Sequence, residues 1–506
     1  MSRVSIFLSP ELAYPTSVDF SPDERYPEYP FQEIATHKNL TYAGIRELLR
    51  MSEADCERYS SPHWNPLGKW ISKGDRVFVL PNFVTDRQPR ESLGEFLGKC
   101  THASVLRAVI DYALIAAQDM GMISFGNAPM QSCDYRRVLE ETGARALADF
   151  YRRSLNSSIA PCDLRGLISR WSRLRTLRSR RTTEEETVAV DLGKDSLLEQ
   201  LNYGCARAPR FRVRDYDPAM TESFHGKGRH VYVMNKRILE SKVVISVPKL
   251  KTHEKVALTC ALKGTVGTIA RKECLAHWSR GGPKEGGDEH ASSNWRRRLT
   301  DTLGDQADCR GETFLANSIR FLCKALTKVC SYGPASYRDG AWYGNDTAWR
   351  MTLDIARIIR YARVDGSMSS EPQRNHLAFI DGIIAGEGEG PLLPRPRNVG
   401  ALLFSDDVAA IDYASALLMG FDAMQVPLVR NAFGQMSYQV SDASLEGSDL
   451  VVNHRNVSAA ELRRLLPRPF QVPKGWIGHL GTETVTVESP RRADIMPRSN
   501  VHFSKE

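Results

Sequence analysis

The sequence predicts an α/β fold, in which a mostly parallel sheet is flanked by helices, with two insertions and an irregular C-terminal extension. Short apolar runs rich in β-branched residues recur along the chain, and each ends on polar or turn residues. Helical patterns lie between several of these runs, and the order strand, helix, strand is typical of a parallel sheet. At 506 residues the chain is long for a single hydrophobic core, so either two subdomains or one large domain with insertions is expected.

The individual elements follow from the spacing of the apolar residues. Strands buried on both faces are expected at residues 76–82, 121–129, 229–235, 242–249, 376–383 and 399–407. Residues 102–121 place Val105, Val109 and Leu114 on one helical stripe, and residues 407–420 repeat this arrangement. Both segments are therefore expected to be helices that cover the sheet.

The places where the alternation of strands and helices is interrupted predict how the chain is divided. We expect an N-terminal extension at residues 1–73, an α/β core domain at 74–425 with insertions at about 150–225 and 279–345, and a C-terminal extension at 426–506. Within the first insertion, apolar residues of segment 164–181 stand at helical spacing and arginines fill the other positions. This pattern predicts an arginine-coated surface helix leading into a flexible insertion, and a nucleic-acid or membrane-binding face is the alternative.

Composition narrows the class of protein and of partner. A net charge of +8 over this length is modest, and it fits a small anionic metabolite better than a nucleic acid, which requires a concentrated basic face. The ten cysteines include no CxxC pair, so no zinc ribbon and no iron–sulfur cluster is expected. Scattered reduced thiols and the lack of a long apolar run predict a soluble, cytoplasmic protein without a membrane partner.

Chemistry-bearing side chains concentrate at the ends of the expected strands, where open α/β sheets bind their ligands. The strand within 242–249 runs directly into Pro248, Lys249, Lys251, Thr252 and His253. Lysines and hydroxyls beside glycine-rich backbone form an anion cradle, because ammonium groups and exposed N–H groups converge on a carboxylate or phosphate. The substrate-binding residues expected on this basis are Lys249, Thr252, Thr259, Lys263, Asn82, Asn127 and Asp381.

Three residues of the same region are candidates for catalysis. A lysine in a partly dry pocket loses its proton readily and histidine titrates near neutrality, so Lys251, His253 and His277 are expected to act as acid or base. The glycine-rich acidic stretch 381–391 is expected to be a loop that closes over the pocket. The alternative is a solvated loop whose lysines point into water.

The motifs around these residues resemble a known family. "KVVISVPKLKTH" (242–253), "TCALKGTVG" (259–267) and "KECLAH" (272–277) occur in the order of the central signature of domain-of-unknown-function family 362. The resemblance extends over most of residues 74–425. It departs at Gly264, where the family commonly has asparagine, and the ferredoxin-type cysteine module of some relatives is missing. The resemblance therefore implies where the site lies and no iron–sulfur cluster, but not which reaction takes place.

A divalent metal is an open alternative as a cofactor. The family-like segments bring His102, His253 and His277 together, and Glu387 could add an oxygen ligand. The spacing of these residues matches no compact metal-binding motif.

The sequence thus predicts an enzyme that acts on a small carboxylate- or phosphate-bearing metabolite. Lysines bind the anion and histidine moves a proton, and the reaction takes place with or without the help of a metal. A non-catalytic protein that binds an anion or a metal is the alternative. In either case Lys249, Lys251, His253 and Asp381 are expected to line one concavity.

Overall fold

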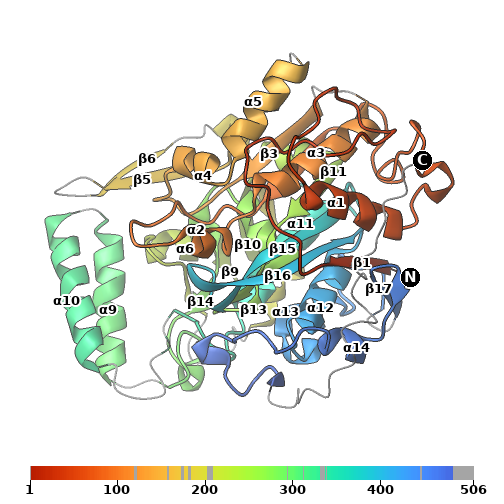
Figure 1. The fold of residues 1–506 in the computed structure, drawn as a ribbon. Helices are drawn as coiled ribbons and strands as arrows, with labels where there is room; N and C mark the ends of the chain where they lie inside the picture. The colour runs from red at the N-terminus through yellow and green to blue at the C-terminus, as the bar shows by residue number, and fades with distance from the viewer. Residues whose placement is uncertain are drawn as a thin grey trace.

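The computed structural model describes residues 2–118, 122–155, 159–171, 176–180, 184–201, 209–292, 295–311, 313–330, 337, 339–444 and 447–482. Its centre is a mixed, mostly parallel 11-stranded sheet (Figure 1). The main path runs in the order β18 (Arg455–Asn456), β17 (Ser448–Val452), β1 (Ser2–Leu8), β16 (Leu393–Ser405), β15 (Asn375–Glu389), β11 (Val243–Val247), β2 (Val77–Pro81), β3 (Ile123–Asn127) and β4 (Pro161–Asp163). Beside this path, β12 (Lys249–His253) pairs with β15 and with β13 (Ala257–Leu258).

The strands that surround β11 all run in the same direction. The pairs β15–β11, β11–β2, β2–β3, β3–β4 and β12–β15 are parallel, whereas β16 is antiparallel to both of its neighbours. Parallel strands present their carboxyl ends at one edge of the sheet. The expected α/β fold with a mostly parallel sheet is therefore confirmed.

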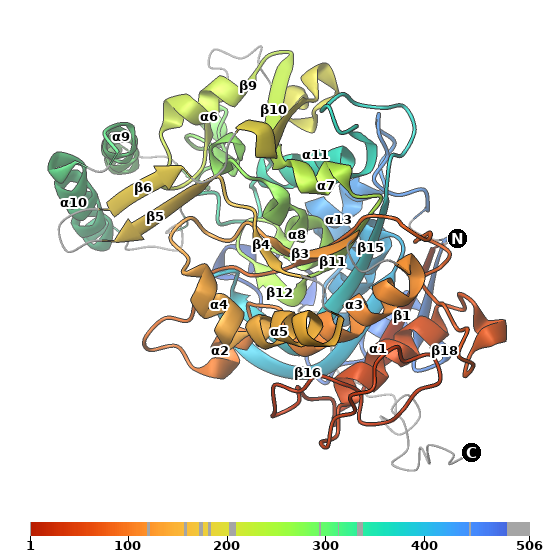
Figure 2. The same ribbon diagram turned by 90° about the horizontal axis from the view of Figure 1, so that it is seen from above.

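Helices cover both faces of this sheet, as Figure 2 shows from above. On one side lie α1 (Leu40–Met51), α3 (Ala103–Ala117) and α5 (Ala144–Leu155), and on the other lie α8 (Cys260–Gly264) and α11 (Ala348–Tyr361), while α12 (Val408–Leu418) packs beside α8. Alternate residues of β2 point to the two opposite helix layers. Val77 and Val79 pack with side chains of α1 and α3, whereas Phe78 and Leu80 pack with side chains of α11. This is why the strands read as continuous apolar runs.

The remaining helices and strands form the periphery. The helices are α2 (Leu93–Leu97), α4 (Tyr135–Glu141), α6 (Pro218–Phe224), α7 (Lys236–Glu240), α9 (Trp295–Cys309), α10 (Phe314–Cys330), α13 (Pro427–Ala432) and α14 (Ala459–Arg463). Small sheets are formed by β7 (Thr187–Asp191), β10 (Arg229–Asn235) and β9 (His225–Gly226), and by β8 (Phe211–Arg212) with β14 (Trp278–Ser279). None of the helices in the described part of the chain is long and apolar enough to cross a lipid bilayer.

Five of the six expected strands lie in the main sheet, as β2, β3, β11, β15 and β16. The sixth, expected at 229–235, is strand β10, but it belongs to the separate antiparallel sheet with β7 and β9. Its side chains Tyr232 and Met234 are buried in the same apolar cluster as α11. An apolar run reports burial but not the partner strand, so the sequence could not distinguish the two sheets.

The stretch 381–391, expected to be a closing loop, is mostly strand. β15 continues to Glu389, and β16 returns antiparallel to it from Leu393. The glycines of this stretch permit close packing: a Cβ at Gly386 would lie 2.6 Å from the Gly98 carbonyl oxygen, and one at Gly382 would lie 3.0 Å from the Ala401 oxygen. The glycine-rich pattern therefore reflects close backbone approach, within a long hairpin at Gly382 and against the end of α2 at Gly386, and not a flexible loop.

The arginine-rich segment is a β-hairpin and not the expected helix. β5 (Leu167–Trp171) pairs antiparallel with β6 (Thr176–Arg180). The five residues of β5 are Leu-Ile-Ser-Arg-Trp, which do not alternate between apolar and polar, so the residue pattern gave no sign of the strand or of its pairing with β6. At the base of the hairpin, Arg165 is buried, lies 2.7 Å from Asp163, and donates to three backbone carbonyls, of Met130, Gln131 and Cys133.

The parts of the chain outside 74–425 also enter the sheet. β1 from the expected N-terminal extension pairs with β16 and with β17 from the expected C-terminal extension. The expected insertion at 279–345 contains α9 and α10, which pack side by side and project from one side of the molecule (Figures 1 and 2). The division into three segments stays a prediction, and residues 483–506 of the third lie outside the described residues.

We expect the replacement Arg165→Ala to lower the free energy of unfolding by about 3–5 kcal/mol, because it leaves the buried Asp163 carboxylate without its cation. Urea unfolding measures this change. The matched control is Arg152→Ala on the surface of α5, where the side chain is 69% exposed, and its effect should stay within about 0.5 kcal/mol. Equal effects of the two replacements would contradict the anchoring role of Arg165.

Candidate functional site

The candidate site is built by a change of pairing at Pro248. β11 lies between β2 and β15, but after Pro248 the chain continues as β12, which pairs only with β15 on its parallel side. The Pro248 carbonyl accepts the Asp381 N–H at 2.8 Å, and the register shifts between Lys249 and Lys251. Such a bulge re-aims the side chains of a strand. Lys249 and Lys251 therefore reach different surroundings although they are two residues apart.

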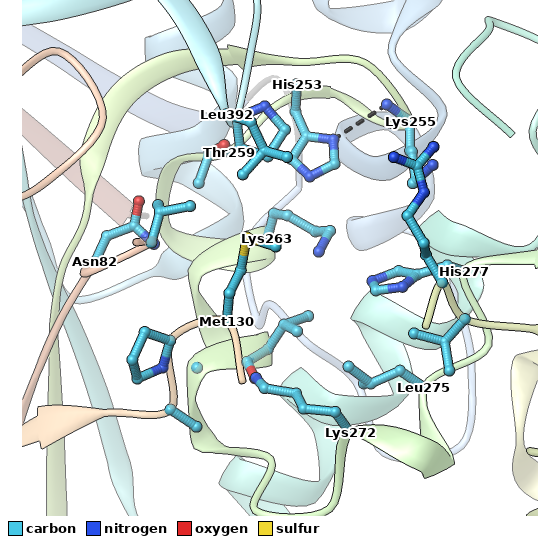
Figure 3. A pocket seen from close by; sticks show the side chains of 18 of the residues that line it. Asn82, Met130, His253, Lys255, Thr259, Lys263, Lys272, Leu275, His277 and Leu392 are labelled. Atoms are coloured by element: carbon cyan, nitrogen blue, oxygen red, sulfur yellow. Dashed lines mark hydrogen bonds between the residues drawn. The ribbon is translucent and has the colours of Figure 1, made fainter. Parts of the chain in front are cut away.

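A cavity of about 240 Å³ opens beside β12 (Figure 3). Five cationic and two carboxylate side chains are among its lining: Arg214, Lys251, Lys255, Lys263 and Lys272, with Asp215 and Glu254. The lining also includes two histidines, four polar residues and two apolar residues: His253 and His277, Asn82, Asn127, Gln131 and Thr259, and Pro391 and Leu392. We call this space the lysine cavity.

Lys263 is the cation of this cavity that the protein leaves without an acceptor. It extends from α8, only 8% of the residue is exposed, and its side chain points into the cavity in Figure 3. No hydrogen bond or ion pair of its ammonium occurs within the described residues, and the charges that act on it are those of Lys272, Lys255 and Lys251. Burial and these like charges lower the Lys263 pKa to about 7.

The other three lysines of the cavity each have an oxygen acceptor. Lys251 donates to the Asn82 Oδ1 at 2.5 Å and to the Lys99 carbonyl at 2.7 Å. Lys272 donates to the Val266 carbonyl at 3.0 Å, and Lys255 donates to the Asp339 carbonyl. Burial lowers the pKa of Lys251 and of Lys272 to about 7 and that of Lys255 to about 8.

Both histidines of the cavity are neutral at neutral pH. Burial, followed by the charges of Lys263 and Lys255, lowers the pKa of His253 and of His277 well below the usual value. The Lys255 backbone N–H donates to the His253 Nδ1 at 3.1 Å, so the proton of the neutral His253 ring resides on Nε2. The His277 ring nitrogens have no hydrogen-bond partner among the residues that the structure describes. His253 thus offers a fixed donor, and His277 is free to accept a proton.

Several polar atoms of the cavity wall lack partners as well. The Thr259 Oγ1, the Asn127 Oδ1 and the Gln131 Oε1 are buried and make no hydrogen bond with any residue that the structure describes. Thr259 lies between two residues with left-handed backbone, Ala257 (φ 70°) and Cys260 (φ 37°). Backbone strain of this kind occurs where the surrounding structure imposes it, commonly at binding sites. Unsatisfied polar atoms in a cavity wall are available to a ligand.

Lys249 and Asp381 do not line the lysine cavity, which corrects the expectation that they share a concavity with Lys251 and His253. They form a fully buried ion pair at 3.0 Å, and Tyr14 from the N-terminal segment bonds to both, at 2.6 Å from the Lys249 Nζ and 2.7 Å from the Asp381 Oδ1. The register shift before Lys251 separates the two environments. This trio is a structural link between β12, β15 and the N-terminal segment.

The other expected site residues divide in the same way. Asn82, Asn127, Thr259, Lys263, Lys251, His253 and His277 all line the lysine cavity. Thr252 instead donates to the Gly388 carbonyl at 2.8 Å and fastens β12 to the β15–β16 hairpin. From the stretch 381–391, only Pro391 at the hairpin tip reaches the cavity, together with Leu392.

The four expected metal ligands are not gathered into one set. Glu387 is held by Arg468 at 2.7 Å and by Arg397 at 3.3 Å, and His102 stacks on the Tyr14 ring at 4.2 Å, away from the cavity. In the described part of the chain, one group of potential ligands has its atoms within 4.8 Å of one another: Glu289, His290 and Asp301. None of these three lines the lysine cavity. Asp301 lies in α9, eleven residues after His290, so the group forms no compact sequence motif.

Arg214, Lys255 and Lys272 were not among the expected binding residues. Lys272 is the first residue of "KECLAH", so the family-like motif could have identified it as a site residue. Arg214 lies in the first insertion, far from the others in sequence, and only the fold reveals that it reaches the same cavity.

Comparisons with known proteins agree with the motifs. Residues 176–416 match the family model described as Domain of unknown function (DUF362), and this match confirms the resemblance. A stretch of 51 residues is 41% identical to the thylakoid-associated protein sll1697 of Synechocystis sp., and it covers 10% of this chain and 16% of that protein. No solved structure matches the chain.

The depressed pKa of Lys263 predicts how stability depends on pH. In the unfolded chain this lysine has a pKa near ~10.4, so between about pH 7 and pH 10 the unfolded chain binds more protons than the folded one. The contribution of Lys263 to the free energy of unfolding therefore rises with pH across this window, and the penalty for burying the charge is complete below about pH 7.

We expect Lys263→Met to flatten this rise, because the variant lacks one of the groups that cause it. Urea unfolding of both proteins at several pH values within the window measures the two slopes. Identical slopes would show that Lys263 keeps an ordinary pKa in the folded protein.

Proposed function

We propose that the protein is an enzyme that acts on a small carboxylate- or phosphate-bearing metabolite in the lysine cavity. The lysines hold the anion, and His277 or His253 moves a proton. The observation that carries this proposal is the buried Lys263 ammonium, which has no acceptor within the described residues and faces three more lysines. A buried charge without a partner is costly, and an anionic ligand removes that cost.

The composition of the cavity wall supports a small anion. Five cations against two carboxylates leave an excess of positive charge around the space. The volume of about 240 Å³ suits a metabolite of few atoms, since drug-sized ligands occupy roughly 300–1,000 Å³. Because these charges converge on an interior space and not on an extended face, we propose a metabolite and not a nucleic acid as the ligand.

The state of the histidines supports proton transfer. His277 is neutral and its ring nitrogens have no protein partner in the described part of the chain, so it is able to accept a proton from a bound substrate. The negative charge of a bound substrate offsets the lysines that lower the His277 pKa, and this raises its basicity once the complex forms. His253, with its proton on Nε2, donates a hydrogen bond to a developing negative charge.

A reducing compartment fits the cysteines. The eight cysteines whose state the structure gives are all free thiols, and four of them are buried. We therefore propose a cytoplasmic location, where thiols stay reduced.

We expect Lys263→Met to weaken the binding of inorganic phosphate or oxalate by about 10- to 150-fold. This corresponds to about 1.5–3 kcal/mol for the loss of one charge-assisted hydrogen bond. Isothermal titration calorimetry at about pH 7, the pKa of Lys263, measures the affinity. The matched control is Lys284→Met, which removes an exposed lysine outside the cavity and should leave the affinity unchanged.

The outcomes separate the classes of function. Equal affinities in the wild type and Lys263→Met, or no binding of any anion, would contradict the proposal. Anion binding that is lost in the variant, without turnover of any substrate under a screen of small anionic metabolites, would favour the non-catalytic binding protein.

A further inference from the structure

Lys263 differs from the other lysines of the lysine cavity in the availability of its amine. The ammonium groups of Lys251, Lys255 and Lys272 are committed to carbonyl or amide oxygens of the protein. Lys263 donates to no group among the residues that the structure describes, and its side chain points into the open space (Figure 3). Its nitrogen is therefore the one of these four that no oxygen of the described residues holds in place.

The surroundings of Lys263 favour the neutral amine. The nearest charges that act on it are three lysines, and it is buried in α8. A lysine desolvated beside other cations loses its proton near neutral pH, and the lone pair of the amine then becomes a nucleophile. The pKa of about 7 agrees with this geometry, since about half of the amine is unprotonated at that pH.

A simple anion-binding role does not require this arrangement. For charge alone, a lysine held by fixed acceptors serves as well, as Lys251 is by its two oxygen partners. An amine kept free beside three ammonium groups suits a ligand that has both an anionic group for the ammonium groups and an electrophilic carbon for the amine. A 2-oxo acid joins these two features on adjacent carbons.

We propose that Lys263 is a nucleophile that forms a Schiff base with the carbonyl carbon of a 2-oxo acid, whose carboxylate is held by the other lysines of the cavity. This inference rests on the proposed function, because it names the substrate class of the same site. It adds a covalent step to the binding of an anion.

The step balances without any further reagent. The neutral Lys263 nitrogen adds to the carbonyl carbon, a C–N bond forms, and the electron pair of the C=O π bond moves to oxygen. That oxygen takes a proton which the nitrogen releases, and His277 is placed in the cavity to carry it. The nitrogen then loses its second proton, the hydroxyl group takes up a proton and departs as water, and the C=N bond remains. His253 donates from Nε2 and stabilises the oxygen as its charge develops.

Reductive trapping tests the inference directly. The full chain is incubated with pyruvate, the simplest stable 2-oxo acid, and with cyanoborohydride, which reduces a Schiff base to a secondary amine. Intact-mass analysis should show the addition of one carboxyethyl group, and peptide mapping should place it on Lys263. The same treatment without pyruvate should leave the mass unchanged.

The matched variant is Lys263→Arg, which keeps a positive charge but cannot form a Schiff base. We expect this variant to bind phosphate within a few-fold of the wild type by calorimetry and to give no trapped adduct. A second variant, Lys284→Arg, alters an exposed lysine outside the cavity and should still be trapped.

The outcomes of the two measurements are distinguishable. A wild type that binds phosphate but is not trapped with pyruvate, or is trapped on another lysine, would overturn the inference and leave the proposed anion site intact. Failure to bind either phosphate or pyruvate would overturn the proposed function and the inference with it. An adduct on Lys263 that is absent from Lys263→Arg supports both.

Discussion

The whole candidate site depends on the cost of burying positive charge. The lysines that line the cavity, and the nearby Lys249 and Lys99, have side chains in the interior, where water no longer solvates the ammonium group. The protein meets this cost in two ways. Lys249 and Lys99 are neutralised by carboxylates, at 3.0 Å from Asp381 and 2.6 Å from Glu91. Among the described residues, the lysines of the cavity have neutral oxygens as hydrogen-bond acceptors, Lys255 also lies 3.6 Å from the Glu254 carboxylate, and Lys263 has no acceptor.

The fold explains how these two groups of lysines come to be so close. Pro248 ends the pairing of β11 with β2, and the register shift in β12 sends Lys249 toward Tyr14 and Lys251 toward Asn82. The paired lysines fix β12 to its neighbours, while the cavity lysines keep a space that carries excess charge. Neighbouring lysines of one short motif thus differ in their surroundings: Lys249 is neutralised inside the protein, whereas Lys251 lines the cavity.

Sequence reasoning located most of the named cavity residues but not their contacts. The lysine-rich end of β11, with Lys251, His253, Lys263 and His277, was recognised because parallel sheets bind ligands at strand ends and because the motifs resemble a family. Lys249 and Asp381 were assigned to the same concavity because nothing in the sequence shows a register shift. Arg214 was missed because its contribution depends on how an insertion folds back over the sheet.

The same limits apply to the fold. The mostly parallel sheet was predictable from buried apolar runs, since the period and composition of these runs report burial on both faces. Pairing partners were not predictable, so β10 was expected in the main sheet. Glycines at 382 and 386 were interpreted as signs of a loop, whereas Gly382 allows close approach of β16 and Gly386 allows close approach of the Gly98 carbonyl at the end of α2. The helical spacing in 164–181 was misleading, because the residues of β5 carry no period-two pattern that would have announced its pairing with β6.

The central claim is that the lysine cavity is an anion site with Lys263 at its centre. The most direct measurement is a crystal structure of the protein grown or soaked with selenate, whose selenium atom is located by its anomalous signal. The account predicts an anomalous peak inside the cavity, with a selenate oxygen within hydrogen-bond distance of the Lys263 Nζ. A cavity that holds only water, with selenate bound elsewhere on the surface, would contradict it.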